Sequence, residues 1–170
     1  MEIAIRATAP AAGRLVWAGR EVVCTLGHGG IRADKREGDG ATPAGLFTLR
    51  RVLWRADRLA DPPVTRLPCA PILPTDGWCD WPEDPLYNRP VTLPYPARHE
   101  RMWRDDALYD IVGVIGYNDS PAVSGLGSAI FLHVAGPDYA PTEGCVALAI
   151  DDLIRVLADC DETTTITIGD

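Results

Sequence analysis

The sequence predicts a mainly β domain, a sandwich or partly open barrel, with one helix near its C-terminus and long proline-rich loops. Three observations support this fold class. Short β-branched and aromatic runs recur along the chain, glycine and proline punctuate the segments between them, and one segment has clear helical spacing. We expect residues 1–170 to form a single domain, because this length is the usual size of one.

The first half reads as short strands and turns. Residues 2–7 alternate with period two, as a half-buried strand does. Residues 14–19 and 21–26 are β-rich runs joined by a very short turn, which predicts a hairpin. A glycine-rich, charged segment follows, and residues 46–54 read as another strand.

Residues 56–98 contain ten prolines. Proline removes a backbone donor and interrupts β-ladders, so we expect ordered loop with brief strands. The aromatic side chains of this region argue against disorder. A loop this long in a compact domain is usually functional, and we expect it to form a wall or lid of a cleft.

The second half has the strongest signals. Residues 109–118 and 128–135 are apolar, β-branched runs typical of central strands. Residues 151–159 have helical spacing, with an apolar face of Leu153, Val156 and Leu157 and acidic residues in the first turn. Residues 163–169 read as a closing strand.

The composition excludes several function classes. The net charge of −8 argues against general nucleic-acid binding, which needs a basic surface. No stretch approaches the roughly 20 apolar residues of a membrane span. The N-terminal segment lacks the basic start and apolar run of a secretory signal. We expect a monomer.

The five cysteines (Cys24, Cys69, Cys79, Cys145 and Cys160) cannot all pair within one chain, so a monomer has a free thiol. Their spacing is irregular and contains no CxxC, which disfavours a zinc ribbon or a thioredoxin-like motif. Cys69 and Cys79 flank a proline-rich loop, where a disulfide would require an oxidising compartment. The three histidines are dispersed, so we expect no catalytic metal.

Residues 130–157 carry the candidate chemistry. His133 lies near the end of an apolar strand, and Cys145 follows twelve residues later in a Thr-Glu-Gly-Cys turn. A loop of this length can return the thiol to the imidazole, and a thiolate beside imidazolium is a strong nucleophile. Gly144 permits close approach of a substrate, and amides of the turn could stabilise an oxyanion. The structural alternatives are a small core cysteine and a packed histidine.

This segment resembles the catalytic core of the L,D-transpeptidase family, the YkuD domain. That family has a strand histidine, a loop, a Ser/Thr-x-Gly-Cys turn and an acidic helix start. His133 matches the histidine and Asp151 or Asp152 matches the acidic position. The turn is matched by Thr142, Gly144 and Cys145. Residues 40–47 resemble the family's Gly-x-Thr-Pro-x-Gly-x-Phe block. The overall pattern is most similar to the small single-domain proteobacterial branch.

The resemblance implies a peptidoglycan enzyme without a cofactor. Cys145 would attack a carbonyl of one stem peptide to form a thioester, with His133 as base and then acid and the Val134 carbonyl orienting the imidazole. An amine of a neighbouring stem would then resolve the thioester and complete a crosslink. The substrate implies the periplasm or cell envelope, with the cytoplasm as the alternative.

The sequence departs from the family pattern in three places. The usual arginine two residues after the cysteine is Ala147, the usual histidine before the Gly-Cys pair is Glu143, and the loop from His133 to Cys145 is shorter. Because arginine recognises carboxylates by paired hydrogen bonds, its loss should change how the donor stem is held. This favours the branch that crosslinks through the first stem residue (1,3 type) over the third (3,3 type). Glu143 either faces the acceptor amine or is simply solvated.

Other candidate substrate-binding residues are His99, Tyr117 and Asn118, which the sequence places after the proline-rich region and after a central strand. The structural alternatives are that His99 is a surface histidine and that Tyr117 and Asn118 belong to an ordinary turn. Trp54, Trp78, Trp81 and Trp103 are candidates for a glycan wall, although core packing explains most tryptophans.

Two other functions remain open at this point. Water could resolve the same thioester, which would make the protein a hydrolytic cysteine peptidase or amidase on stem peptides. Alternatively, the domain could bind peptidoglycan without catalysis and carry an inert cysteine.

Overall fold

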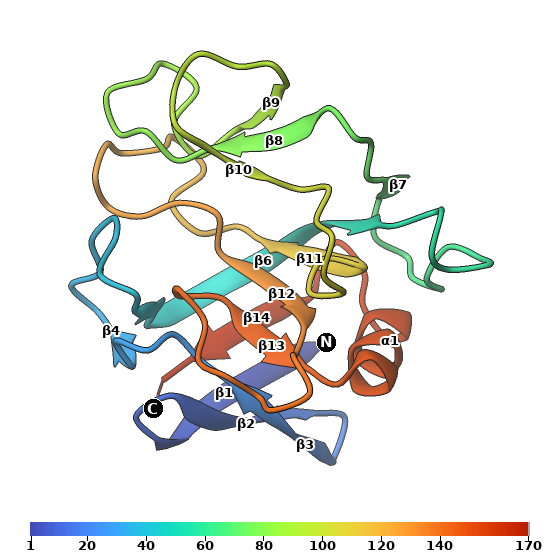
Figure 1. The fold of residues 1–170 in the computed structure, drawn as a ribbon. Helices are drawn as coiled ribbons and strands as arrows, with labels where there is room; N and C mark the ends of the chain where they lie inside the picture. Colours follow the sequence, from blue (N-terminus) through green and yellow to red (C-terminus); the bar gives the residue numbers. More distant parts are fainter. Residues whose placement is uncertain (170) are drawn as a thin grey trace.

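A β-sheet that closes on itself forms the body of the protein in the computed structural model, which describes residues 1–169 (Figure 1). The elements are β1 (Glu2–Ala9), β2 (Ala12–Trp17), β3 (Arg20–Thr25), β4 (Ile31–Arg32), β5 (Thr42–Pro43), β6 (Gly45–Trp54), β7 (Cys69–Pro71), β8 (Asp76–Cys79), β9 (Pro90–Thr92), β10 (His99–Arg101), β11 (Ile111–Ile115), β12 (Phe131–Val134), β13 (Val146–Leu148), α1 (Ile150–Ala158) and β14 (Thr165–Ile168).

The long strand β6 closes the barrel. The sheet runs in the order β11-β12-β13-β3-β2-β1-β14-β6-β7, and β11 pairs with β6 as well as with β12. β6 has ten residues, so its first part pairs with β14 and its remainder with β11. A closed sheet leaves few free edges, which limits edge-to-edge association.

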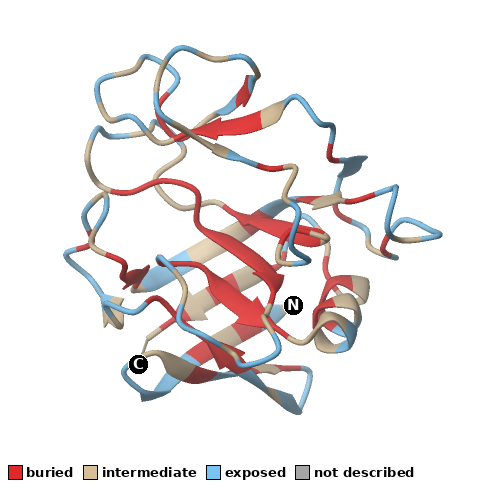
Figure 2. Ribbon diagram, viewed as in Figure 1, coloured by how far each residue is buried: buried red, intermediate tan, exposed pale blue. Residues whose placement is uncertain are grey.

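Strands β11 and β12 lie between two apolar cores, and every residue of both strands is buried (Figure 2). Leu132 and Val134 face the main core inside the barrel. Phe131 belongs to a second core on the other face, together with Trp78, Tyr109 and Cys145. This two-sided burial explains the continuous apolar runs of these strands.

The proline-rich region builds a second, smaller layer over that outer face (Figure 1). Its three short strands form a sheet in the order β10-β8-β9. Trp78 of β8 packs edge-on against Phe131, with 5.1 Å between the ring centroids. The expected long loops with brief strands are present, and they cover the strand that carries His133.

The mainly β fold with one helix after Cys145 confirms the predicted fold class. The helix buries Leu153, Val156 and Leu157, as the spacing predicted. No helix among residues 1–169 is long and apolar enough to cross a membrane.

Candidate active site

Strand register places His133 and Cys145 on the same face of the sheet. β12 and β13 are parallel, with His133 opposite Ala147. Cys145 lies two residues before Ala147 and therefore points to the same side as both. Neighbouring strands lie about 4.8 Å apart and alternate residues about 6.6 Å apart, so the two Cα atoms are separated by roughly 8 Å. An imidazole side chain spans much of that distance.

The tautomer of His133 is set by a backbone contact. Its Nδ1 lies 2.8 Å from the Val134 carbonyl oxygen. A carbonyl only accepts, so Nδ1 carries the hydrogen, and in the neutral ring Nε2 carries the lone pair. Burial, partly offset by the contact with Val134, lowers the pKa of His133 to about 4. The imidazole is therefore a neutral base at physiological pH.

The Cys145 thiol is directed at the backbone of the neighbouring strand segment. Sγ donates to the Ala129 carbonyl at 3.2 Å and accepts from the Phe131 N–H at 3.4 Å. Burial and, to a smaller extent, the negative charge of Glu100 raise the pKa of the thiol to about 12. Cys145 is 7% exposed, and that surface lines a pocket that His133 also lines.

These shifts give a different resting state from the thiolate and imidazolium expected from sequence. A thiol with a raised pKa beside an imidazole with a lowered pKa is a neutral pair. A thiol in this state would need a base such as His133 to take its proton before it could act as a nucleophile.

We predict that Cys69 will be alkylated before Cys145 in the free protein at neutral pH. Alkylation needs a reachable thiolate. Burial raises the pKa of both thiols, but Cys69 is exposed at the surface whereas Cys145 is buried and its pKa rises to about 12. Peptide mapping by mass spectrometry after a short exposure to iodoacetamide measures the order. The Cys69→Ser variant should lose the fast phase. Fast labelling of Cys145 that slows in His133→Ala would instead indicate a preformed ion pair.

Thr142 fixes the turn that presents the cysteine. Its hydroxyl donates to the Cys145 carbonyl at 2.6 Å and accepts from the Gly144 N–H at 3.1 Å. Gly144 has a φ of +135°, which L side chains rarely adopt. A Cβ at this position would lie 2.7 Å from the Ala41 carbonyl oxygen. The turn therefore requires glycine both for its conformation and for its packing.

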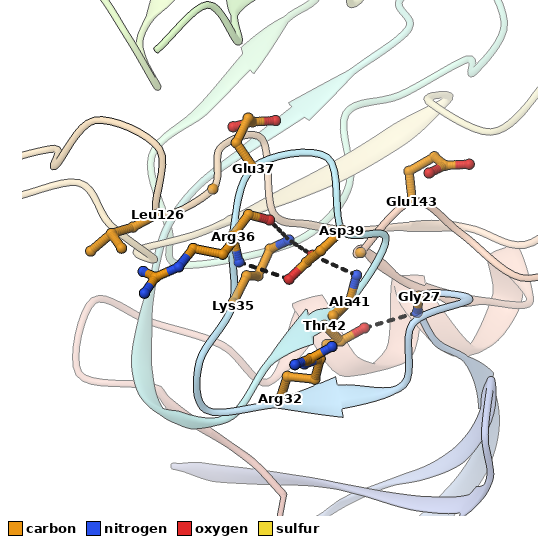
Figure 3. A network of polar contacts seen from close by, with 12 residues as sticks. Gly27, Arg32, Lys35, Arg36, Glu37, Asp39, Ala41, Thr42, Leu126 and Glu143 are labelled. Atoms are coloured by element: carbon orange, nitrogen blue, oxygen red, sulfur yellow. Dashed lines mark hydrogen bonds and ion pairs between the residues drawn. The ribbon is translucent and has the colours of Figure 1, made fainter.

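The Gly-x-Thr-Pro block packs directly against the turn of residues 142–145. The Thr42 hydroxyl accepts from the Gly27 N–H at 2.9 Å (Figure 3). A Cβ on Gly27 would lie 2.9 Å from the Gly144 Cα, and a Cβ on Gly40 would collide with the His28 ring. His28 in turn contacts Glu143, with 3.0 Å between Nε2 and Oε2. The two sequence motifs thus form one packed unit.

A buried lysine lies in the same loop. Lys35 is 4% exposed, and its Nζ lies 2.8 Å from Asp39 Oδ1 and 3.2 Å from the Arg36 carbonyl (Figure 3). Asp39 also accepts from the Arg36 and Ala41 N–H groups. The Lys35 charge lowers the pKa of Cys145, against the larger effect of burial. Lys35 is the single lysine of the chain, and that composition was the one sequence signal that could have singled it out.

His133, Cys145 and Lys35 all line a pocket of about 560 Å³. Beyond the candidate catalytic pair, its lining includes Ala147, Thr142 and Glu143 from the region of the turn. Several lining side chains were not singled out from the sequence: Lys35, Glu37, Asp80, Glu100, Arg104 and Tyr109. The small Ala147 side chain leaves the space beside His133 open.

Tyr117, Asn118 and His99 lie outside the lining of this pocket. Tyr117 donates to the Leu126 carbonyl at 2.5 Å, and the Asn118 amide bonds the carbonyls of Val123 and Gly127. Both residues therefore hold the loop between β11 and β12. His99, in β10, lines a separate hollow, with its Nδ1 2.7 Å from the Ala97 carbonyl.

The tryptophans and the other cysteines have ordinary surroundings. Trp78 is buried, Trp103 stacks beneath the Arg55 guanidinium at 3.7 Å, and Trp81 is exposed. Cys69 and Cys79, the candidate disulfide partners, are both free thiols.

Comparison with known protein families gives one match. The model for YkuD, the L,D-transpeptidase catalytic domain, matches residues 6–168. Nothing among curated proteins or solved structures matches significantly. The matched range spans both motifs, the barrel and the small sheet that covers it.

Proposed function

Because the chain belongs to the YkuD family of L,D-transpeptidase catalytic domains, we propose that it crosslinks peptidoglycan stem peptides through a thioester on Cys145. The observation that carries this proposal is the state of His133. Its Nδ1–H is fixed on the Val134 carbonyl, which leaves Nε2 as a base on the face and in the pocket that it shares with Cys145.

The acylation step follows from this arrangement. As Cys145 Sγ attacks a stem-peptide carbonyl, His133 Nε2 takes the thiol proton and a C–S bond forms. The C–N bond to the leaving residue then breaks, and His133 gives the same proton to the departing amine. The imidazole ends this step neutral, as it began, and the acyl group remains on the sulfur.

The oxyanion of the tetrahedral intermediate needs a backbone donor close to the sulfur. The Gly144 N–H is already donated to the Thr142 hydroxyl. We therefore assign this role to the Cys145 N–H, the next amide of the turn. Gly144 contributes by its conformation, and Thr142 by holding the turn.

We extend the proposal to a 1,3-type crosslink, with the first residue of the donor stem as the acyl group. Ala147 provides no cation for a donor carboxylate, and its small side chain faces the pocket beside His133. Glu143 lies at the rim with its side chain 89% exposed, held by His28. We place the reaction in the periplasm, where peptidoglycan stems are crosslinked.

Product analysis tests the proposed function. We expect the purified protein to convert disaccharide tri-, tetra- and pentapeptides into dimers, and tandem mass spectrometry of those dimers will identify the donor residue. Crosslinks through the third residue would contradict the 1,3 assignment and leave transpeptidation intact. Shortened stems without dimers would identify a hydrolase. If no muropeptide changes, a non-catalytic binding role would replace the proposal.

A further inference from the structure

A partly buried carboxylate and a buried tyrosine lie directly beside the candidate catalytic pair. The Tyr109 hydroxyl donates to Glu100 Oε1 at 2.5 Å. The Tyr109 ring packs edge-on against His133, with 5.3 Å between centroids. Its hydroxyl also lies near enough to Cys145 to lower the pKa of the thiol, although its hydrogen is directed at Glu100. Tyr109 therefore links Glu100 to both reacting side chains.

Among the residues that the structure describes, only one oxygen of Glu100 has a polar partner. Oε1 accepts from Tyr109 and lies 3.9 Å from the Arg104 guanidinium. Within residues 1–169, Oε2 makes no hydrogen bond, whereas every fully buried side-chain oxygen and nitrogen has a partner. Oε2 is therefore open to the pocket that Glu100 lines, which agrees with the 28% exposure of its side chain. This leaves a strong hydrogen-bond acceptor facing the reaction space.

The negative charge of Glu100 is incompletely balanced. The nearest cation, Arg104, makes two short bonds to Asp106, at 2.6 and 2.8 Å. The other lysine or arginine of the pocket lining, Lys35, is paired with Asp39. Glu37 and Asp80, two of the four other carboxylates of the lining, share the cation Arg98, and their charges still raise the pKa of Glu100. A cationic ligand group would complete this part of the pocket.

We propose that Glu100 binds the acceptor, the second stem peptide: its Oε2 holds the cationic amine of that peptide next to the Cys145 thioester. This inference rests on the proposed function, because it assigns the second substrate of the same reaction. Tyr109 is a positioning residue that fixes the carboxylate through Oε1 and leaves Oε2 free.

The proposed site also supplies the proton chemistry that aminolysis requires. An ammonium group cannot attack, so it first gives one proton to Glu100. Burial raises the pKa of Glu100, which makes it a better base than an exposed carboxylate. The amine then attacks the thioester, and His133 takes its second proton as the C–N bond forms. The C–S bond breaks, the sulfur recovers that proton from His133, and Glu100 releases its proton to water.

The test compares a cationic acceptor with an uncharged one on the same acyl-enzyme. A disaccharide tripeptide supplies the ammonium acceptor, and hydroxylamine, which is uncharged at neutral pH, supplies the other. For Glu100→Gln we expect thioester formation to persist and not to slow, because loss of the Glu100 charge removes one of the influences that raise the pKa of Cys145. Transfer to the tripeptide should fall about tenfold or more through a raised KM for the acceptor, with reaction of hydroxylamine unchanged. Tyr109→Phe should show the same pattern more weakly.

Asp84→Asn is the matched control, since Asp84 accepts from the Tyr95 hydroxyl at 2.8 Å outside this pocket. It should leave both acceptor reactions unchanged. Equal loss of both acceptor reactions in Glu100→Gln would overturn the acceptor assignment, as would no loss of either. If the wild-type protein forms no thioester, the proposed function itself is overturned. If the thioester forms but Glu100→Gln affects both acceptors equally, only the acceptor assignment is overturned.

Discussion

Replacing Cys145 with alanine is expected to abolish muropeptide turnover and leave the fold intact. No other group in the pocket can form the thioester, so the loss should reach a factor of about 10⁴ or more, as for other enzymes that lose their nucleophile. The substitution removes one sulfur from a small core between the barrel and the β10-β8-β9 sheet. Dimer formation measured by liquid chromatography, together with circular dichroism, checks both parts of the expectation.

Cys160→Ala is the matched control for this experiment. Cys160 is also a buried free thiol with a raised pKa, but it lies in the main core near the end of α1. This variant should lose some stability and keep its turnover. If Cys145→Ala retained its activity on muropeptides, the thioester mechanism would be wrong.

Gly144→Ala is expected to have the second-largest effect. The alanine would have to adopt a positive φ, which costs of the order of 1–3 kcal/mol, and its Cβ would press against the Ala41 carbonyl oxygen. We therefore expect a free energy of unfolding lower by about 3 kcal/mol, with turnover lost because the turn shifts. Urea denaturation and dimer formation measure the two effects.

Gly19→Ala separates backbone strain from the clash. Gly19 also has a positive φ, of +74°, but a Cβ there would meet nothing within 4 Å. This variant should lose only about 1 kcal/mol and keep full turnover. Equal losses in the two variants would show that strain alone explains the Gly144 requirement, and that packing on the Ala41 loop is unimportant.

The sequence predicted most strands because their patterns are local. The alternation of residues 2–7 and the short turn between the next two runs correspond to β1 and the β2–β3 hairpin. β13 was missed, since three residues after a glycine turn carry too little periodicity. Closure of the barrel was also beyond the sequence, because it depends on β6 pairing with β11 across more than fifty residues of chain.

The site was predictable only where its residues are close in sequence. His133, Gly144 and Cys145 belong to one motif, and the structure brings His133 and Cys145 to one pocket. Glu100, Tyr109 and Lys35 arrive from separate segments, and no spacing rule connects them to the cysteine. The neutral resting pair could not be foreseen either, because it results from burial by the covering sheet.

The most direct test of the account is the intact mass of the protein during turnover. With a donor stem peptide and no acceptor, we expect a covalent adduct equal to the acyl part of the stem, mapped to Cys145, absent in Cys145→Ala and discharged by hydroxylamine. An adduct on another residue would contradict the account, as would product formation with an unmodified protein throughout.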